Sequence, residues 1–215
     1  IGGGFHRYSV DAQWRVPHFE KMLYDQAQLV TSYLEAYQIT RDEIFARVAR
    51  DVLDYVLRNL RDPEGGCYSA EDAESAIDET HPEEKEEGAF YLWTKSEIDH
   101  HLGNEQATIF NYCYGIEDTG NALHDPQHVF TGKNILYAAH TPEEAASAFG
   151  KSPDEIRTVI DDAREKLFIK REQRPRPHLD DKVITAWNGL MISAFAKAYQ
   201  ALDDKAYLDA AVRAA

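Results

Sequence analysis

The chain has 215 residues, 43% of them apolar, and a formal net charge of -15. A chain of this length and composition is expected to be globular, most simply as one domain or a large piece of one. It contains no run of about 18 apolar residues that would predict a membrane span and no basic-then-apolar leader, and its negative charge argues against nonspecific binding of nucleic acid.

The two cysteines, Cys67 and Cys113, are far apart in the sequence and lie in no Cys-x-x-Cys pattern. We therefore expect two reduced thiols in a cytoplasmic protein. The last helix that the sequence predicts is cut off at Ala215, which suggests a piece of a longer protein.

The first elements are helical. After a glycine-rich entry and a strand-like stretch over 5–10, apolar residues at three- and four-residue steps predict a helix from about Glu20 to Gln38. A second helix is expected to begin at an Asp42 cap and to end near Leu60, before Pro63.

Beyond Gly65 and Gly66 the apolar period changes from helical to two. Strands are expected over 67–72 and 88–94, joined by the acidic segment 74–87. We expect that segment to be a solvated loop, because its acids lack the ligand spacing of a calcium site.

The rest of the chain is mostly helical. Helices are expected, in chain order, over 95–102 and 105–114, from a Thr141 cap, from a Ser152 cap to about Arg171, from about Asp181 to Leu202, and from near Asp203 onward. His124 and His128 lie four residues apart, but no predicted helix carries them and no glutamate lies between them, so we expect no metal site there. The sequence does not identify a cofactor.

Two distant stretches open with the same pattern, Pro-His-apolar-acid, at Pro17 and at Pro177. Their histidines are 160 residues apart (178 minus 18), and Tyr37 and Tyr199 further along are 162 apart (199 minus 37). A helix pair that recurs with its opening predicts a repeat architecture. With six or more helices, we expect a mainly α fold, an incomplete α/α toroid with short β-hairpin insertions. A generic helical bundle would give a similar helix count, but it would need no such openings.

We expect the two openings and the acid pair between them to meet at one cavity. Carboxyl groups and a histidine can carry general acid and base chemistry when their surroundings set their pKa values apart. The candidate catalytic residues are His18, Glu20, Asp25, Asp72, His178, Asp180 and Asp181. The candidates for substrate binding, by hydroxyl recognition or by stacking on a sugar ring, are Gln26, Glu71, Tyr91, Trp93, Trp187 and Asn188, with Trp14 as a further stacking candidate. Glycoside hydrolysis would use two of the acids, and sugar epimerisation or isomerisation would shuttle a proton beside a carbonyl.

Each candidate also has a purely structural explanation. Asp25 and Lys21 can be a pair on a helix surface, and Asp180 and Asp181 can be acids favoured by the dipole of a first helical turn. Trp187 can belong to the core.

Several long motifs of this chain closely resemble the spermatogenesis-associated protein 20 and YyaL-like family. The motifs are Gly-Gly-Gly-Phe-His-Arg-Tyr-Ser at 2–9, Val-Pro-His-Phe-Glu-Lys-Met-Leu-Tyr-Asp-Gln-Ala at 16–27, Tyr-Ser-Ala-Glu-Asp-Ala at 68–73, Glu-Gly-Ala-Phe-Tyr-Leu-Trp-Thr at 87–94, and Pro-His-Leu-Asp-Asp-Lys at 177–182 followed by Ala-Trp-Asn-Gly-Leu-Met at 186–191. The resemblance implies an N-terminal thioredoxin-fold domain followed by a six-hairpin α/α toroid similar to N-acylglucosamine 2-epimerases and glycosidases. By that resemblance residues 1–215 are part of the toroid, with a β-hairpin insertion at about 66–94, and the thioredoxin-like domain and the closing hairpins lie outside the chain.

Two classes of function follow from these observations. The first is a carbohydrate-active catalytic domain of hydrolase or epimerase type, with a saccharide as its small-molecule ligand. The second is a non-catalytic scaffold or redox accessory that works with the thioredoxin-like domain and leaves Cys67 and Cys113 inert. Neither class involves nucleic acid or a membrane.

Overall fold

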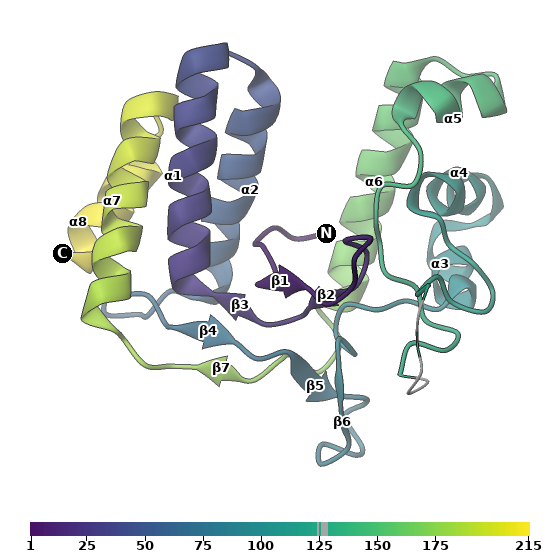
Figure 1. The fold of residues 1–215 in the computed structure, drawn as a ribbon, viewed down its shortest axis with the longest axis horizontal. Helices are drawn as coiled ribbons and strands as arrows, with labels where there is room; N and C mark the ends of the chain where they lie inside the picture. Colours follow the sequence, from purple (N-terminus) through teal and green to yellow (C-terminus); the bar gives the residue numbers. More distant parts are fainter. Residues whose placement is uncertain (124, 126–128) are drawn as a thin grey trace. The chain divides into compact units, whose positions relative to one another are not determined.

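The fold was analysed in a computed structural model, which describes residues 1–123, 125 and 129–215. Within those residues the chain forms eight helices and seven strands of two or three residues, so the expected mainly α class is confirmed (Figure 1). The helices are α1 (Leu23–Thr40), α2 (Glu43–Asn59), α3 (Lys95–Leu102), α4 (Asn104–Tyr114), α5 (Pro142–Phe149), α6 (Pro153–Arg171), α7 (Thr185–Leu202) and α8 (Lys205–Ala214). The strands are β1 (Tyr8–Ser9), β2 (Pro17–His18), β3 (Lys21–Met22), β4 (Ala70–Glu71), β5 (Glu74–Ala76), β6 (Lys85–Glu87) and β7 (Leu179–Asp180).

The chain divides into two compact units. We call them the paired-hairpin unit, which contains Gly2–Tyr8, His18–Ala73 and Pro177–Ala215, and the middle unit, which contains Ile1, Ser9–Pro17 and Glu74–Arg176. The paired-hairpin unit therefore holds the first opening from His18 onward, the whole second opening and the acid pair Glu71-Asp72.

Two helical hairpins, α1 with α2 and α7 with α8, build the paired-hairpin unit, and they pack together mainly through α1 and α7 (Figure 1). Their shared core is formed by fully buried apolar side chains, among them Leu23, Val30, Leu34, Leu53, Val56, Phe195 and Ala198. Burial of a side chain of this kind stabilises the fold by about 1.5 to 3 kcal/mol before the entropy of ordering it is counted.

The two hairpins repeat each other with a constant offset of 162 residues. Helices α1 and α7 both have 18 residues, and they start 162 apart (185 minus 23) and end 162 apart (202 minus 40). Each ends on a residue in the left-handed conformation, Arg41 with φ of 60° and Asp203 with φ of 54°. An aspartate follows in both copies, Asp42 and Asp204, and its side chain caps the next helix. These local signals explain why both hairpins turn alike.

A three-stranded sheet joins the two repeats, with β4 in the centre and β3 and β7 antiparallel to it on either side. Lys21 pairs with Glu71, and Glu71 pairs with Leu179. The expected starts of the two helices, near Glu20 and Asp181, are therefore wrong. The strand that precedes each helix, β3 or β7, pairs with β4, and the N–H of Leu23, the first residue of α1, still donates to the Ser69 carbonyl at 2.9 Å.

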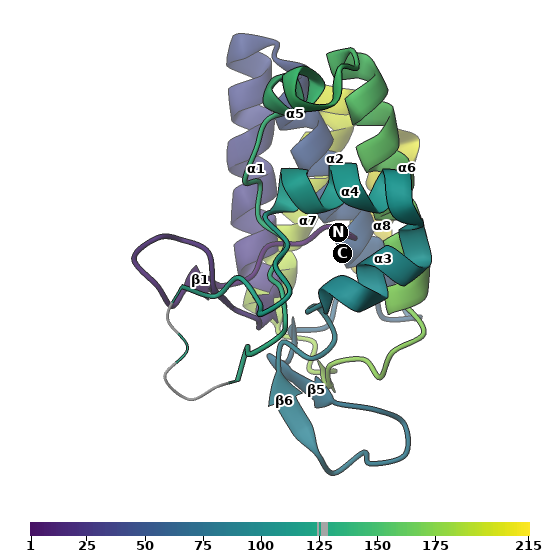
Figure 2. The same cartoon turned by 90° about the vertical axis from the view of Figure 1, so that its right-hand side faces the viewer.

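The middle unit contains the other four helices. Helices α3, α4 and α5 each contact α6, along which they follow one another (Figures 1 and 2). Thr94, Thr141 and Ser152 each form a capping box with a glutamate three residues later, which confirms the starts expected for α5 and α6.

The strands of the middle unit differ from the prediction. Residues 88–94 form tight turns, with the Leu92 N–H donating to the Gly88 carbonyl at 3.0 Å, and only Trp93 makes a bridge, to Asn134. The hairpin consists instead of β5 and β6, so it comes from the acidic segment that was expected to be a loop. Its strands place Glu74 opposite Glu87, a pairing of like charges that sequence rules disfavour.

Helical hairpins packed side by side are the repeating element of an α/α toroid, so the observed pairing is compatible with the expected toroid. The boundaries of that toroid stay a prediction. None of the helices in the described part of the chain is both long and apolar enough to cross a membrane.

Candidate functional site

The sheet of the paired-hairpin unit brings the two Pro-His openings to either side of the acid pair Glu71-Asp72. The Asp72 N–H donates to the His178 carbonyl at 2.9 Å, and Lys21 lies opposite Glu71 on the other side. The sheet lies at the lower ends of α1 and α7 in Figure 1. The backbones of the two openings therefore flank β4, but the side chains of the openings and of the acid pair fall into three separate groups, and the single shared cavity stays a prediction.

The first group contains all three candidate catalytic residues of the first opening, and we call it the His18–Asp25 cluster (Arg7, His18, Glu20, Tyr24 and Asp25). Glu20 accepts a hydrogen bond from Arg7 at 3.0 Å, and its carboxylate lies 3.7 Å from Nε2 of His18. The His18 ring stacks on Tyr8, with 4.9 Å between the ring centroids. Both His18 and Glu20 are about one quarter exposed, so solutes can reach the cluster.

Charge is unevenly distributed within this cluster. Burial raises the pKa of Asp25, and the nearby charge of Glu20 raises it further, while Arg7 opposes the shift. The pKa of Arg7 is raised in turn, chiefly by its hydrogen bond with Glu20. Oδ2 of Asp25 is buried without a hydrogen-bond partner. The cluster thus contains one carboxyl group whose surroundings favour the neutral form, beside a second carboxylate that is paired with a guanidinium.

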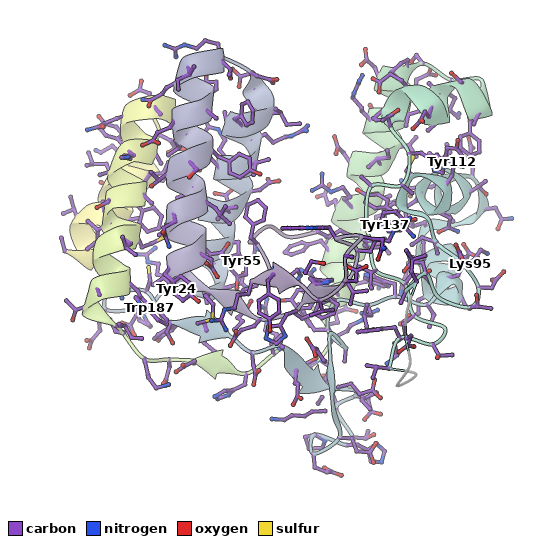
Figure 3. The ribbon with its side chains drawn as sticks, in the orientation of Figure 1. Tyr24, Tyr55, Lys95, Tyr112, Tyr137 and Trp187 are labelled. Carbon is purple, nitrogen blue, oxygen red and sulfur yellow. The ribbon has the colours of Figure 1, made fainter. Side chains whose placement is uncertain are left out.

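Aromatic rings extend the cluster across the repeat. Tyr24, in the first turn of α1, packs edge-on against Trp187 in the first turn of α7, with ring centroids 4.8 Å apart. Figure 3 shows both residues at the lower ends of their helices. Trp187 is only half-buried, so part of its ring stays available for contact with a ligand.

The second group is a buried cluster formed by Lys21 of β3, Tyr55 of α2 and Glu71 of β4. Glu71 is 4% exposed, and its Oε2 accepts a hydrogen bond from the Tyr55 hydroxyl at 2.5 Å. Lys21 donates to the Gly3 carbonyl at 2.8 Å, and its Nζ lies 4.4 Å from the centroid of the Tyr55 ring. These contacts give Glu71 a structural role, and its predicted contact with substrate is not supported by them.

The third group belongs to the second opening and is open to solvent. Asp180 accepts hydrogen bonds from Lys182 at 2.7 and 2.8 Å, and these bonds are the main reason why its pKa is lowered. Asp72, His178 and Asp181 are exposed. None of these four residues joins the His18–Asp25 cluster through a contact that the described structure records, so their predicted catalytic roles stay predictions.

The side-chain amides of Gln26 and Asn188, both candidates for substrate binding, form hydrogen bonds with the backbone instead of facing solvent. Gln26 is fully buried and forms two hydrogen bonds with the backbone of Phe5, at 2.7 and 2.9 Å. Asn188 does the same with the backbone of Cys67, at 2.7 and 2.9 Å. The two positions are 162 residues apart (188 minus 26), so they are equivalent in the repeat. In both residues the side-chain oxygen and the side-chain nitrogen each have a main-chain hydrogen-bond partner.

Tyr91 and Trp93 belong to the middle unit. Trp93 is 2% exposed and its ring is covered by the Arg174 guanidinium, 3.9 Å from the ring centroid. The Arg171 guanidinium lies 5.2 Å from the centroid of the Tyr91 ring. Trp93 therefore serves as a core residue, and neither ring presents a bare face of the kind that sugar stacking needs.

Sequence reasoning missed Arg7, Tyr24 and Tyr55. It offered Lys21 as a helix-surface partner of Asp25, whereas Lys21 is 2% exposed and binds the Gly3 carbonyl. Arg7 lies in the motif Phe-His-Arg-Tyr, and its backbone N–H donates to the Glu20 carbonyl at 3.0 Å, so the fold places this motif beside the first opening. His124 and His128 lie outside the described residues. Among the residues that are described, no group of three His, Cys, Asp or Glu side chains could hold a metal ion.

Comparison with known proteins gives close relatives in sequence. Human spermatogenesis-associated protein 20 is 44% identical over 207 residues, which are 91% of this chain and 26% of that protein. The mouse protein of the same name is 43% identical over 211 residues, with the same coverage of 91% and 26%. The uncharacterized protein B0495.5 of Caenorhabditis elegans is 41% identical over 225 residues, with 100% of this chain and 31% of that protein covered. The chain thus spans about a quarter to a third of the length of these curated relatives.

No family model matches the chain. Among solved structures, a sugar epimerase from a ruminal bacterium aligns with a TM-score of 0.29 and 12% identity, over 99% of this chain and 79% of that one. Cellobiose 2-epimerase from Bacillus thermoamylovorans aligns with a TM-score of 0.24 and 13% identity, over 91% of this chain and 59% of that one. At these TM-scores the likeness carries no argument.

Proposed function

The chain belongs, over the segment that it covers, to the spermatogenesis-associated protein 20 family, and from that premise we propose that the whole protein is a carbohydrate-active enzyme of hydrolase or epimerase type. In this proposal the paired-hairpin unit supplies the acid and base groups, through His18, Glu20 and Asp25. Trp187, with Tyr24 against its edge, contacts the sugar ring. The cytoplasm is the proposed location, in keeping with two buried, unpaired thiols.

The observation that carries the proposal is the contrast between the two carboxyl groups of the cluster. Asp25 has a raised pKa and a buried oxygen without a hydrogen-bond partner, whereas Glu20 is paired with Arg7. Two carboxyl groups in unlike surroundings are the usual arrangement for a general acid and its partner base. Asp25 would donate the proton, and Glu20 or His18 would accept one.

Hydrolysis and epimerisation can each be completed with these side chains, the substrate and water. In hydrolysis, Asp25 protonates the oxygen that leaves when the glycosidic bond breaks, and a water molecule supplies the new hydroxyl. In epimerisation, a base removes the proton beside the carbonyl of the open sugar, and an acid returns a proton to the opposite face. Neither reaction requires an oxidant.

The test is a screen of the full-length protein with free hexoses, N-acylhexosamines and disaccharides, by thermal shift and then by product analysis. Asp25→Asn and Glu20→Gln are expected to lower kcat by about 100-fold or more on any substrate found. Glu35→Gln is the matched control, because Glu35 also forms an ion pair, with Lys197 at 2.7 Å, but lies far along α1. Asp180→Asn shows whether the second opening takes part.

If no saccharide binds, or if Asp25→Asn and Glu20→Gln turn over like the control, the proposal is wrong. The alternative is then a non-catalytic scaffold or redox accessory that works with the expected thioredoxin-like domain. Burial raises the pKa of Cys67 to about 11 and also raises that of Cys113, so neither thiol is suited to redox chemistry. Any such chemistry would come from that other domain.

A further inference from the structure

The loop between β1 and β2 presents a tryptophan to solvent. Trp14 is 83% exposed, the largest exposure recorded for a large apolar side chain of the middle unit. Its backbone has a φ of 58°, in the left-handed region, where bulky residues are rare. The position therefore costs backbone strain and gains little burial in return.

The loop is rigidly built around Asp11. Its Oδ1 accepts hydrogen bonds from the Ser9 hydroxyl at 2.7 Å, the Arg15 N–H at 2.8 Å and the Val16 N–H at 3.1 Å. Burial alone would raise the pKa of Asp11, but these hydrogen bonds outweigh it and the pKa is lowered. The base of the loop is closed by a bond from the Val10 N–H to the Val16 carbonyl at 2.8 Å. The strained residue is thus held in place from both sides.

Folding gives no reason for tryptophan at this position. A glycine would adopt the same φ without strain, and an asparagine at lower cost. Strain that the surroundings maintain around an exposed side chain is typical of sites where that side chain contacts a ligand. The ring is therefore best explained by something that binds to it.

The size of the surface decides what kind of ligand fits. Within the loop the other exposed apolar side chains are Val10, at 58% exposure, and the small Ala12, while the residues next to the tryptophan, Gln13 and Arg15, are polar. A stable protein interface needs roughly 800 Å² on each partner, far more than one indole ring and one valine supply. The ring instead matches a small ligand with one flat apolar face and hydrogen-bonding groups at its edge.

Charge further restricts the chemical class of the ligand. The formal net charge of -15 disfavours nucleotides and other phosphates. Organic cations are usually held by several aromatic rings that form a cage, and this loop offers one. A neutral pyranose with equatorial hydroxyls has a flat face of axial C–H bonds and hydroxyls at its rim, so it suits a single indole flanked by polar side chains.

We propose that Trp14 is the stacking platform of a saccharide-binding site on the β1–β2 loop, in addition to the His18–Asp25 cluster. Gln13, which is exposed beside it, would bind a hydroxyl at the rim of the sugar. The class of ligand rests on the proposed function, because both sites would take glucose-type pyranosides. The binding step itself does not require the catalytic step.

The experiment measures binding of cellobiose to the full-length protein by titration calorimetry, in the Asp25→Asn background so that turnover is slow during the titration. Trp14→Ala is expected to weaken binding about tenfold, a loss in the range of a single aromatic contact. Trp14→Phe keeps an aromatic face and should retain affinity within about threefold. Sorbitol, which has the hydroxyls but no ring face, should not bind.

Four results would overturn the proposal. The first is equal affinity for cellobiose in Trp14→Ala and the parent. The second and third are binding of sorbitol as well as cellobiose, and binding of choline in place of cellobiose. The fourth is a large loss of thermal stability in Trp14→Ala, which would show that the ring is packed inside the whole protein. None of these results tests the catalytic role that is proposed for the His18–Asp25 cluster. Conversely, if cellobiose binding depends on Trp14 but no variant of the cluster changes turnover, the loop site stands and the proposed catalytic function fails.

Discussion

Asn188 offers the most direct test of how the paired-hairpin unit is held together. Its side-chain oxygen accepts a hydrogen bond from the Cys67 N–H at 2.7 Å, and its nitrogen donates to the Cys67 carbonyl at 2.9 Å. Asn188→Leu keeps the number and branching of the side-chain heavy atoms and removes both bonds. Because Cys67 is only 2% exposed, its two backbone groups would be left buried without partners.

The expected cost follows from those two groups. A buried backbone group without a partner costs about 1 to 3 kcal/mol, so the variant should lose about 4 kcal/mol in total. A loss of that size raises the population of the locally opened state about 1000-fold. For a chain of this size it also lowers Tm by roughly 9 °C if the whole chain unfolds together.

The assay is the rate at which a maleimide modifies Cys67, followed by mass spectrometry of the peptide. Cys113, which is also buried and free, is the internal reference. Gln200→Leu is the control variant, because Gln200 lies on the same helix but is exposed, and it should leave the rate unchanged. Modification of Cys67 in Asn188→Leu within about threefold of the parent would refute the argument that this amide is a structural clamp, and its predicted role in hydroxyl recognition would regain priority.

Three further predictions concern single residues. Asp25→Asn should raise thermal stability at neutral pH: the folded pKa of Asp25 is raised, so the parent loses stability as the pH rises through that pKa, and the gap between the two proteins should close in acid. Equal Tm values at every pH would contradict the burial that is assigned to Asp25. Trp14→Gly should stabilise the protein by about 1 kcal/mol, because glycine relieves the strain at a φ of 58°, and a lower Tm would show that the ring is packed. Ser152→Ala should cost about 1 kcal/mol in urea unfolding through loss of the capping box with Glu155, and Ser147→Ala, at an exposed helix-interior site, is the control that should change little.

Local signals predicted most of the helices well. The caps at Thr141 and Ser152 lie where the sequence placed them, because a capping hydrogen bond reaches only two or three residues along the chain. The repeat was visible for the same reason. Its offset of 162 at Tyr37 and Tyr199 is kept along the whole of α1 and α7.

The candidate site could be predicted only in part. His18, Glu20 and Asp25 come together because they lie within eight residues of one another (18 to 25). The two histidines of the openings are not equivalent in space, because the strands that follow them differ by 158 residues (179 minus 21) while the helices differ by 162. Four extra residues before α7 therefore shift the second opening relative to the first, and pattern matching at the histidines did not show this.

By itself the sequence determined most of the helical segments, the caps at Asp42, Thr141 and Ser152, and that one hairpin recurs, since each of these depends on neighbours a few residues away. Only the tertiary structure decided that the residues before Leu23 join a sheet, that Glu71 is buried against Tyr55, and that Gln26 and Asn188 bind main chain. The partners in these contacts are 16 to 121 residues apart in the chain. Hydrogen bonds over such separations form only when packing of the apolar core brings the segments together, and no local pattern carries that information.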